Sequence, residues 1–245
     1  MVWDTATGER LHTLRDKSDN MMALQDLAID PEASTESEIV LFSSSSDPFI
    51  RRWRITLDSA SQILDTTNGT KDKPASTHIL EHETSIYKIM FSGDDEDTDL
   101  WTASADGTAK CLSRSRNWQK EDSYEHKDYV RAVVVSTDWV VTAGRDENVK
   151  VWDRATGKVH HVYEGHFEEV TGLVLLEGEQ RVVSVSIDGT VRTWSLGKND
   201  LQNAIKEADE KAKGEVKVEK PKSKKSLMTA EEEAELAELM GSDEE

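Results

Sequence analysis

Residues 184–194 read SVSIDGTVRTW, and residues 142–152 read TAGRDENVKVW. Each stretch begins with Ser or Thr, has an Asp four residues later and ends with a Trp six residues after that. Residues 43–53 (SSSSDPFIRRW) keep this spacing, and residues 102–112 (TASADGTAKCL) keep it with Leu in place of the Trp. Self-similarity at a period of about 40 residues is the signature of repeat architectures. The chain is therefore expected to be an array of similar units.

The spacing within each unit fits a β-hairpin. Residues 181–187 (RVVSVSI) and 190–196 (TVRTWSL) are rich in β-branched residues, and Asp188-Gly189 stands between them. Asp-Gly between two such runs is a strong signal for a tight turn. The turn recurs at Asp106-Gly107, at Asp146-Glu147-Asn148 and at Asp47-Pro48. Pro is tolerated at the last of these because it lies in the turn. We therefore expect an all-β chain.

A further strand is expected before each hairpin. Three of the turns are preceded, at a steady offset, by a His that opens an apolar run. The runs are HETSIYKIMF from His82, HKDYVRAVVV from His126 and HFEEVTGLVLL from His166. Asn20 takes the place of the His in the first repeat, where LQDLAID follows.

These features resemble the WD-repeat β-propeller family. Val2-Trp3-Asp4 and Val151-Trp152-Asp153 match the dipeptide that names the family, and a Thr-Gly turn follows each. The family links a His, a Ser or Thr, an Asp and a Trp by buried hydrogen bonds in each blade. The resemblance implies these sets here: His166, Ser184, Asp188 and Trp194; His126, Thr142, Asp146 and Trp152; His82, Thr102 and Asp106, with Leu112 at the Trp position; and Asn20, Ser43, Asp47 and Trp53.

The resemblance also implies the domain organisation. Residues 1–196 would form about four to five blades, which is partial relative to the seven-bladed ring usual in this family, and 197–245 a charged, partly helical tail. The blades are expected at 1–15 (partial), 20–65, 82–124, 126–163 and 166–196. The last blade lacks a fourth strand, which residues 9–14 could supply to 191–196. A truncated start is the favoured explanation for the missing blades, and closure by other chains or an unusually small ring are the alternatives.

A His, a Ser and an Asp could instead form a catalytic triad. The sets here repeat once per blade, as a structural part does and a single active site does not, so we expect no catalysis. No nucleophile elbow, phosphate loop or metal-ligand spacing occurs in the sequence. We therefore expect a chain that is not an enzyme, with no cofactor, no metal and no small-molecule substrate.

The composition indicates which classes of partner and which cellular compartments suit the chain. The net charge of -19 makes direct nucleic-acid binding unlikely, because Lys and Arg supply that affinity. The single Cys, Cys111, excludes a disulfide framework and suits a reducing compartment. No run of about 18 apolar residues occurs, and the N-terminus does not read as a signal peptide. We expect a chain without a membrane contact, located in the cytoplasm, the nucleus or both. Arg51, Arg52 and Arg54 are expected to be solvated edge charges.

In this family the loop face nearest the central channel is the usual docking surface. The positions that the resemblance directs there include Tyr87, Tyr129, Arg131, Arg145 and Glu169. Tyr and Arg dominate the hot spots of protein interfaces, so these residues are candidates for protein binding. The alternative is that Tyr87 and Tyr129 merely pack on the loops that lead into their blades.

Two insertions interrupt the repeats. Residues 58–77 (DSASQILDTTNGTKDKPAST) are rich in small polar residues and are expected to form a loop between blades. Residues 93–99 (GDDEDTD) are expected to form an acidic hairpin tip. The tip does not have the calcium-loop arrangement, since it lacks a central Gly and a closing Glu.

The tail has a different composition. Residues 200–213 suit a short helix with Asp200 at its N-cap, and residues 220–225 (KPKSKK) have the basic density of a nuclear-import signal or of a plain linker. Thr229 and Glu232 form a capping box for a helix near 230–240. Its apolar residues Leu236, Leu239 and Met240 are candidates for docking on a partner, and a frayed solubilising tail is the alternative.

We therefore expect a non-catalytic scaffold or adaptor that binds other proteins through its propeller face and its tail. One alternative is a substrate receptor of a ubiquitin ligase, but the motif Trp-Asp-x-Arg used there is not matched, because Arg154 comes one position early after Trp152-Asp153. The other alternative is a subunit of a nuclear ribosome-assembly or RNA-processing complex, which the basic tail would suit.

Overall fold

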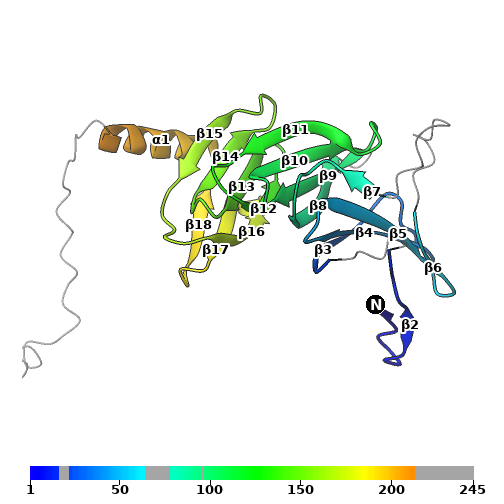
Figure 1. The fold of residues 1–245 in the computed structure, drawn as a ribbon. Helices are drawn as coiled ribbons and strands as arrows, with labels where there is room; N and C mark the ends of the chain where they lie inside the picture. The colour runs from blue at the N-terminus through cyan, green and yellow to red at the C-terminus, as the bar shows by residue number, and fades with distance from the viewer. Residues whose placement is uncertain (17–21, 64–77, 95–96, 213–245) are drawn as a thin grey trace, which may run out of the picture. The chain divides into compact units, whose positions relative to one another are not determined.

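Among the residues that the structure describes, every regular element is a β-strand except one short 3-10 helix and one α-helix. The computed structural model describes residues 1–16, 22–63, 78–94 and 97–212 (Figure 1). It divides into two units, Met1–Gln202 and Asn203–Glu245, and all the strands lie in the first. Asn20, the basic run 220–225 and the docking candidates Leu236, Leu239 and Met240 lie outside the described residues, as does the helix expected near 230–240.

The strands form successive antiparallel sheets, each built from consecutive strands of the chain. A small sheet of β1 (Val2–Trp3) and β2 (Arg10–His12) comes first. The first large sheet contains β3 (Leu24–Ile29), β4 (Ile39–Ser45), β5 (Phe49–Ile55) and β6 (Ala60–Gln62), with β7 (His78–Leu80) also paired to β5. The second large sheet contains β8 (Ile86–Asp94), β9 (Asp97–Ser104), β10 (Thr108–Ser113) and β11 (Gln119–Glu125).

The third large sheet contains β12 (Val130–Val135), β13 (Trp139–Gly144), β14 (Val149–Asp153) and β15 (Val159–Tyr163). The fourth contains β16 (Val170–Leu176), β17 (Arg181–Ser186) and β18 (Val191–Ser195), with a 3-10 turn, η1 (Glu177–Glu179), between β16 and β17. The expected all-β architecture of repeated antiparallel blades is confirmed.

The hairpin turns follow from the turn residues. Gly107 and Gly189 have φ angles of 85° and 78°, in the left-handed region that Gly adopts without steric cost. Glu147 occupies the equivalent position of the third sheet with φ 66°. The three hairpins therefore share one backbone shape although one of them lacks Gly.

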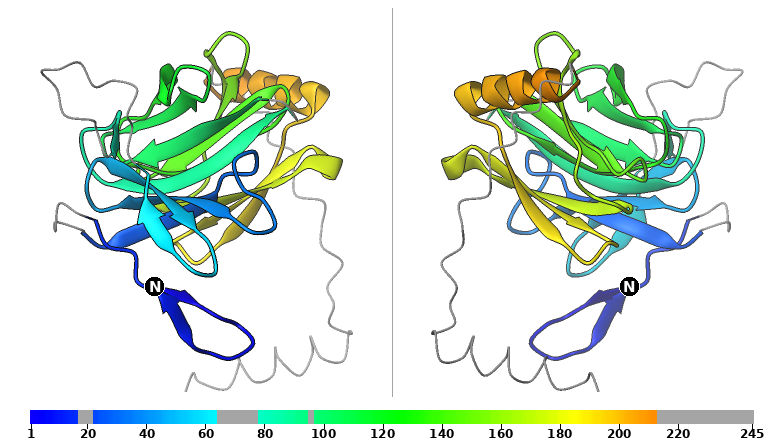
Figure 2. Two further views of the ribbon diagram at one scale, coloured as in Figure 1. Left: turned by 90° about the vertical axis from the view of Figure 1, so that its right-hand side faces the viewer. Right: turned by 90° about the vertical axis from the view of Figure 1, so that its left-hand side faces the viewer.

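Successive sheets pack face to face and bury apolar side chains between them. One cluster joins the first sheet to the second and includes Phe42, Ile50, Ile89 and Leu100. A second cluster joins the second sheet to the third, and these two sheets lie side by side in both views of Figure 2. A third cluster joins the third sheet to the fourth and includes Leu201. The core is thus divided into layers between neighbouring sheets.

Three expectations about the strands and the tail are wrong. Residues 10–12 pair with β1 and do not complete the last sheet, where β18 pairs only with β17 among the described strands. The predicted loop 58–77 is wrong near its start, where residues 60–62 form the strand β6. This strand forms because the chain reverses in a tight turn and Ala60 pairs with Ile55. Within the loop, 64–77 lie outside the described residues.

The helix expected near 200–213 is present as α1 (Lys198–Ala212), but Asp200 is not its N-cap. Asp200 lies in the first turn, where its carboxylate accepts a hydrogen bond from Ser195 Oγ at 2.6 Å. The Leu201 N–H donates to the Gly197 carbonyl at 2.9 Å, so the helix begins two residues earlier than predicted.

Among the described residues, no helix has the length and apolar character needed to cross a bilayer.

Candidate protein-interaction surface

Each complete His–Ser/Thr–Asp–Trp set is a continuous hydrogen-bonded chain. In the third sheet, His126 Nδ1 lies 2.9 Å from Asp146 Oδ1, and its Nε2 lies 2.7 Å from Thr142 Oγ1. Trp152 Nε1 donates to the same hydroxyl at 2.7 Å. A neutral imidazole satisfies all of these groups, because Nδ1–H donates to the carboxylate and Nε2 accepts the hydroxyl proton. The hydroxyl oxygen then accepts from the indole.

The fourth sheet repeats this arrangement. His166 contacts Asp188 at 2.9 Å and Ser184 at 2.7 Å, and Trp194 Nε1 donates to Ser184 Oγ at 2.8 Å. In the second sheet His82 contacts Asp106 and Thr102, both at 2.7 Å, and Leu112 stands where the Trp would donate. The sets tie the loop before each sheet to its second and third strands.

The carboxylates of these sets are held ionised. Burial alone would raise the pKa of Asp146, but the hydrogen bond from His126 and the nearby Lys150 lower it to about 2. At Asp106 burial is likewise outweighed by His82, and the pKa lies well below its usual range. These aspartates therefore act as hydrogen-bond acceptors that position the loops.

A cationic residue that was not among the predicted site residues stands four positions after each turn Asp. Lys110 Nζ lies 3.7 Å from Asp106, and Lys150 Nζ lies 3.3 Å from Asp146. Arg51 fills the position in the first sheet and Arg192 in the fourth, where Arg192 donates to Thr190. The recurring offset of four residues in the sequence is the signal that could have revealed it.

Arg51 is not a solvated edge charge, so that expectation is wrong for this residue. Its side chain is buried and donates from Nε to Asp16 at 2.5 Å and from Nη2 to Asp47 at 2.9 Å. His78 Nε2 also lies 2.7 Å from Asp16. Arg51 thus donates hydrogen bonds to the Asp47 carboxylate in the first sheet, and in the other three sheets a His contacts the turn Asp. Arg54, in contrast, has a largely exposed side chain, as expected.

The five candidates for protein binding come together across three sheets. Arg131, on β12, lies with its guanidinium 4.0 Å from the ring centroid of Tyr87, on β8. The same guanidinium donates from Nε to Glu169 Oε1 at 2.7 Å, at the loop before β16. Arg131 is therefore clamped between an aromatic face and a carboxylate, each from a neighbouring sheet.

Tyr129 and Arg145 extend this contact. The Arg145 guanidinium lies 5.3 Å from the centre of the Tyr129 ring, and its Nε is 3.8 Å from Asp128 Oδ2. The rings of Tyr129 and Tyr87 are 6.5 Å apart. We call the five residues Tyr87, Tyr129, Arg131, Arg145 and Glu169 the aromatic–arginine surface.

The side chains of this surface differ in their exposure to solvent. Tyr129 is 40% exposed and Tyr87 is half-buried, while the Arg145 side chain is more than half exposed. The alternative was that the two tyrosines only pack on loops. Tyr87 does have a packing role, because it lies beneath Arg131. Tyr129 fits this alternative less well, because its side chain is more exposed. The guanidinium of Arg145 can still donate hydrogen bonds to a partner, because its ion pair with Asp128 is long, at 3.8 Å.

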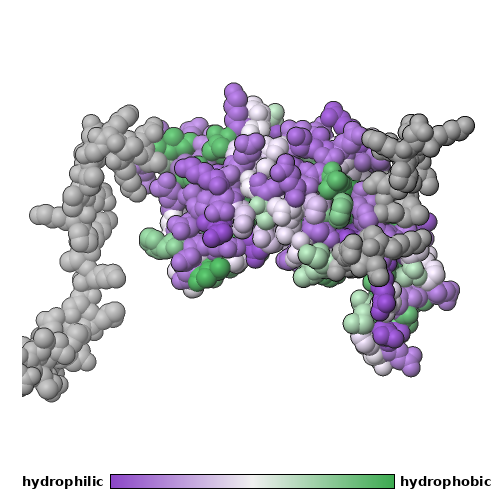
Figure 3. Space-filling view, in the orientation of Figure 1, coloured by the Kyte–Doolittle hydropathy of each residue, from purple (hydrophilic) through white to green (hydrophobic). Residues whose placement is uncertain are grey.

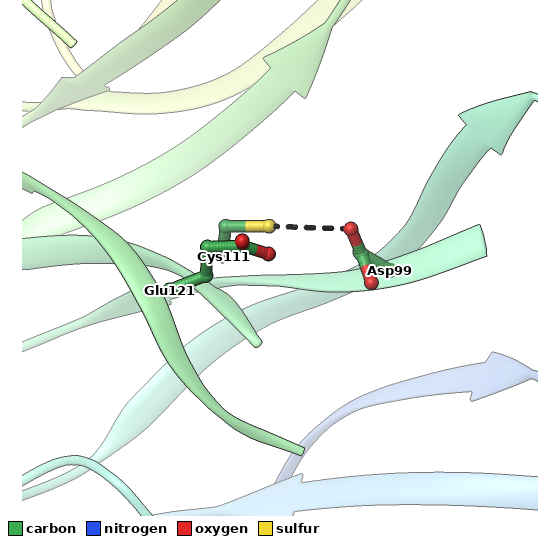
Figure 4. Close-up of side chains that lie close together, drawn as sticks. All are labelled: Asp99, Cys111 and Glu121. Atoms are coloured by element: carbon green, nitrogen blue, oxygen red, sulfur yellow. Dashed lines mark hydrogen bonds between the residues drawn. The ribbon is translucent and has the colours of Figure 1, made fainter. Parts of the chain in front are cut away.

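A second cluster of polar side chains lies on the second sheet. Asp99, Cys111 and Glu121 have ligand atoms within 4.8 Å of one another, and the Cys111 thiol donates to Asp99 (Figure 4). Burial, helped by Asp99 and Asp122, raises the pKa of the Cys111 thiol far above its ordinary value. A metal-binding Cys must be deprotonated, so this environment opposes metal binding.

The chain is similar to known repeat proteins. The model for the WD domain, G-beta repeat, matches residues 118–153 and 157–195. An uncharacterized WD repeat-containing protein of Schizosaccharomyces pombe is 30% identical over 97% of this chain and 68% of its own length. Cilia- and flagella-associated protein 52 of Homo sapiens is 46% identical, but over 22% of this chain and 9% of its own length.

Solved structures show the same fold. The computationally designed Ika4 protein matches 78% of this chain and 100% of its own with a TM-score of 0.53 and 23% identity. The designed Ika8 protein matches 73% of this chain and 48% of its own with a TM-score of 0.52 and 24% identity. Likeness at this level of identity concerns the fold alone.

Proposed function

Because the chain belongs to the WD-repeat protein family, whose domains generally mediate protein–protein interactions, we propose that it is a non-catalytic scaffold that binds another protein through the aromatic–arginine surface. The family gives the class of function, and the surface is our assignment within it.

The observation that carries the proposal is the convergence of Tyr87, Tyr129, Arg131, Arg145 and Glu169 from three sheets. Arg131 is fixed by Tyr87 and Glu169, so little side-chain freedom would be lost when a partner covers it. Aromatic and Arg side chains held in this way are the usual anchors of protein interfaces.

Arg145 supplies the polar specificity in this proposal. Its guanidinium is exposed, rests on Tyr129 and pairs only loosely with Asp128. A carboxylate of the partner could therefore form a bidentate pair with it, which fixes the orientation of the bound protein.

The experiment compares protein partners recovered with the tagged chain from its native cells. We expect the double variant Tyr129→Ala/Arg145→Ala to lose a defined partner at least tenfold, while Arg116→Ala keeps it. Arg116 is the matched control, because it has an exposed Arg side chain at the other end of the strands, between β10 and β11. Circular dichroism and thermal unfolding confirm that each variant is folded. Unchanged recovery with the folded double variant would contradict the proposal.

The tail and the location in the cell are the subject of two separate proposals. We propose that Leu236, Leu239 and Met240 of the tail provide a second docking segment and that the run at 220–225 directs part of the protein to the nucleus. Replacing Lys220, Lys222, Lys224 and Lys225 by Ala should shift a fluorescent fusion toward the cytoplasm. An unchanged distribution would contradict nuclear import by this run.

A further inference from the structure

The turn between β10 and β11 differs from the equivalent turns of the chain. In the β1–β2 and β14–β15 turns, Gly8 and Gly157 have φ angles of 72° and 66°. In the second sheet Trp118 takes this position with a φ of 65°. Its N–H donates to the Ser113 carbonyl at 2.8 Å, just as the Gly157 N–H donates to the Asp153 carbonyl at 2.9 Å. A bulky side chain therefore stands in a backbone conformation that Gly adopts in the other turns.

This left-handed conformation costs free energy for a residue with a Cβ, so a bulky residue keeps it only where its surroundings compensate. For Trp118 the compensation comes from packing. The indole is 6% exposed, and its ring centre lies 5.1 Å from that of Phe42, on β4, and 6.0 Å from that of Phe91, on β8. The Arg114 guanidinium lies 4.8 Å from the centre of the indole. The turn thus holds an aromatic side chain at the junction of the first and second sheets.

Trp118 lines a pocket of about 210 Å³ at this junction, which we call the Trp118 pocket. Its apolar side is formed by Val40, Phe42, Ile63 and Trp118. Val40 and Phe42 are buried between the two sheets, as is the indole. The pocket therefore has an apolar and aromatic floor.

The other side of the Trp118 pocket is charged, with three arginines and two carboxylates. Arg114 is fixed, because it donates two hydrogen bonds to Asp30, at 2.7 and 3.1 Å. Arg54 pairs with Glu38 at 2.9 Å, but the Arg54 side chain is 56% exposed. An exposed pair of this kind is weak, so a carboxylate of another molecule can share the Arg54 guanidinium. Together with Arg52, these residues give the pocket a positive lining in a chain whose net charge is -19.

The size and the lining of the Trp118 pocket restrict what it can hold. Sites for cofactors and drug-sized ligands usually measure roughly 300–1,000 Å³, so a pocket of about 210 Å³ suits a single large side chain of another protein. Guanidinium groups attract aromatic faces, and an indole packs well edge to face against another ring. The positive lining favours a carboxylate next to that ring. An aromatic side chain within an acidic segment has both properties.

The surface in the view of Figure 3 is mainly hydrophilic, and its hydrophobic residues form small separate patches. A partner of such a surface is usually anchored by a few side chains that enter well-packed pockets, while the contacts around them contribute little. An apolar floor within a charged rim, as in the Trp118 pocket, meets this condition.

We propose that the Trp118 pocket is an anchor site for another protein, which inserts one aromatic side chain from an acidic segment. The ring packs on Trp118 and Phe42, and a neighbouring carboxylate of the segment pairs with Arg54. The pocket is separate from the aromatic–arginine surface. Asp30 and Arg114 follow the ends of β3 and β10, whereas the aromatic–arginine surface lies at the opposite end of the strands, near the starts of β8 and β12. The two proposals can therefore fail independently.

The test follows the indole N–H signal of Trp118 in nitrogen-15 NMR spectra of the full chain, where the signal is identified by its loss in Trp118→Phe. The probes are synthetic pentapeptides with blocked ends: one with Phe between two pairs of Glu, one with Ala in place of the Phe, and one with Lys in place of every Glu.

Three variants are compared with the unmodified chain. Arg54→Glu reverses the charge at the rim, and Ala33→Leu narrows the pocket from an exposed position in the loop after β3. Arg181→Glu is the matched control, because the Arg181 side chain is 55% exposed and pairs with Glu179 in the fourth sheet. Circular dichroism checks that each variant is folded.

We expect the Phe peptide to shift the Trp118 signal to saturation with a Kd below about 1 mM, and the Ala and Lys peptides to bind at least tenfold more weakly. Arg54→Glu and Ala33→Leu should each weaken binding of the Phe peptide at least tenfold, and Arg181→Glu should leave it unchanged. Three results would overturn the proposal: no saturable shift with the Phe peptide, equal affinity for the Phe peptide and either of the other two, or unchanged binding to a folded pocket variant. If one of the two pocket variants fails to fold, the other decides.

Discussion

Trp152 donates its indole N–H to the hydroxyl of Thr142, and that hydroxyl also contacts His126 Nε2, both at 2.7 Å. One buried hydroxyl thus satisfies two ring nitrogens from different parts of the blade. In the second sheet the equivalent Thr102 contacts His82 alone among ring nitrogens, because Leu112 stands at the Trp position. The two threonines therefore provide a matched pair.

We expect Thr142→Val to destabilise the fold more than Thr102→Val. The first change leaves the indole of Trp152 and the imidazole of His126 without their partner, and each unsatisfied buried polar group costs roughly 1–3 kcal/mol. The second change removes the partner of the His82 imidazole and a longer hydrogen bond, 3.2 Å, to the Lys110 carbonyl, but it affects no indole. Urea unfolding followed by Trp fluorescence gives both free energies, and equal losses would contradict the shared role of the Thr142 hydroxyl.

The Asp146 carboxylate should make the fold sensitive to acid. Its pKa is lowered to about 2 in the folded chain against an ordinary value of 3.8, so its ionised form stabilises the fold above pH 3.8. That stabilisation, on the order of 2 kcal/mol, is lost as the pH falls from about 4 toward 2. Asp146→Asn should be less stable than the unmodified chain at pH 7 and should lose less stability over this acidic range. Parallel pH profiles of the two proteins would contradict this.

Cys111 should be unreactive in the folded chain. The side chain is 4% exposed, and burial raises the pKa of its thiol. The thiolate is the reactive form, so a disulfide reagent at pH 8 should modify Cys111 at a rate set by unfolding. The rate should rise steeply in urea, in step with the loss of structure. Rapid modification without denaturant would mean that the second sheet opens locally.

The repeat spacing was sufficient to predict the blades, because each hairpin is a local feature. Asp188-Gly189 and Asp106-Gly107 stand between β-branched runs a few residues long, and both turns form where the sequence places them. The members of the aromatic–arginine surface could also be named, since each has a fixed offset within its repeat. The contacts among these residues could not be predicted from the sequence, because Arg131 reaches Tyr87 only when two sheets pack against each other.

Ion pairs between residues far apart in the chain could not be predicted from the sequence. Arg51 reads as one of three basic residues on a strand, and nothing near it shows that Asp16, 35 residues away, lies against it. The start of α1 was misplaced for a related reason. Asp200 is a good N-cap residue by type, but Gly197 accepts the first helical hydrogen bond because the chain leaves β18 close to it.

Arg51 and Arg54 should respond very differently to substitution. Arg51→Leu would leave the buried carboxylates of Asp16 and Asp47 without their shared cation, at an expected cost of roughly 3–5 kcal/mol. Arg54→Leu removes an exposed pair with Glu38 and should cost less than about 1 kcal/mol. Thermal unfolding of the two variants checks this, and similar midpoints would contradict the buried network.

Gly144 links the stability of the third sheet to the aromatic–arginine surface. A Cβ at this position would lie 1.9 Å from the Tyr129 carbonyl oxygen and 2.9 Å from Val130 Cα, and both are backbone atoms. The Arg145 N–H donates to that same carbonyl at 2.8 Å, so any shift of the backbone moves Tyr129 and Arg145 together.

We expect Gly144→Ala to destabilise the chain by roughly 1–3 kcal/mol, because the backbone must move to accept the methyl group. Gly178→Ala is the control, since no atom beyond its chain neighbours lies within 4 Å of its added Cβ, and its stability should change by less than about 0.5 kcal/mol. Gly144→Ala should also weaken partner recovery in the same direction as Tyr129→Ala/Arg145→Ala, when measured below its unfolding temperature. Full partner recovery with a destabilised Gly144→Ala protein would mean that the partner contacts a different part of the chain.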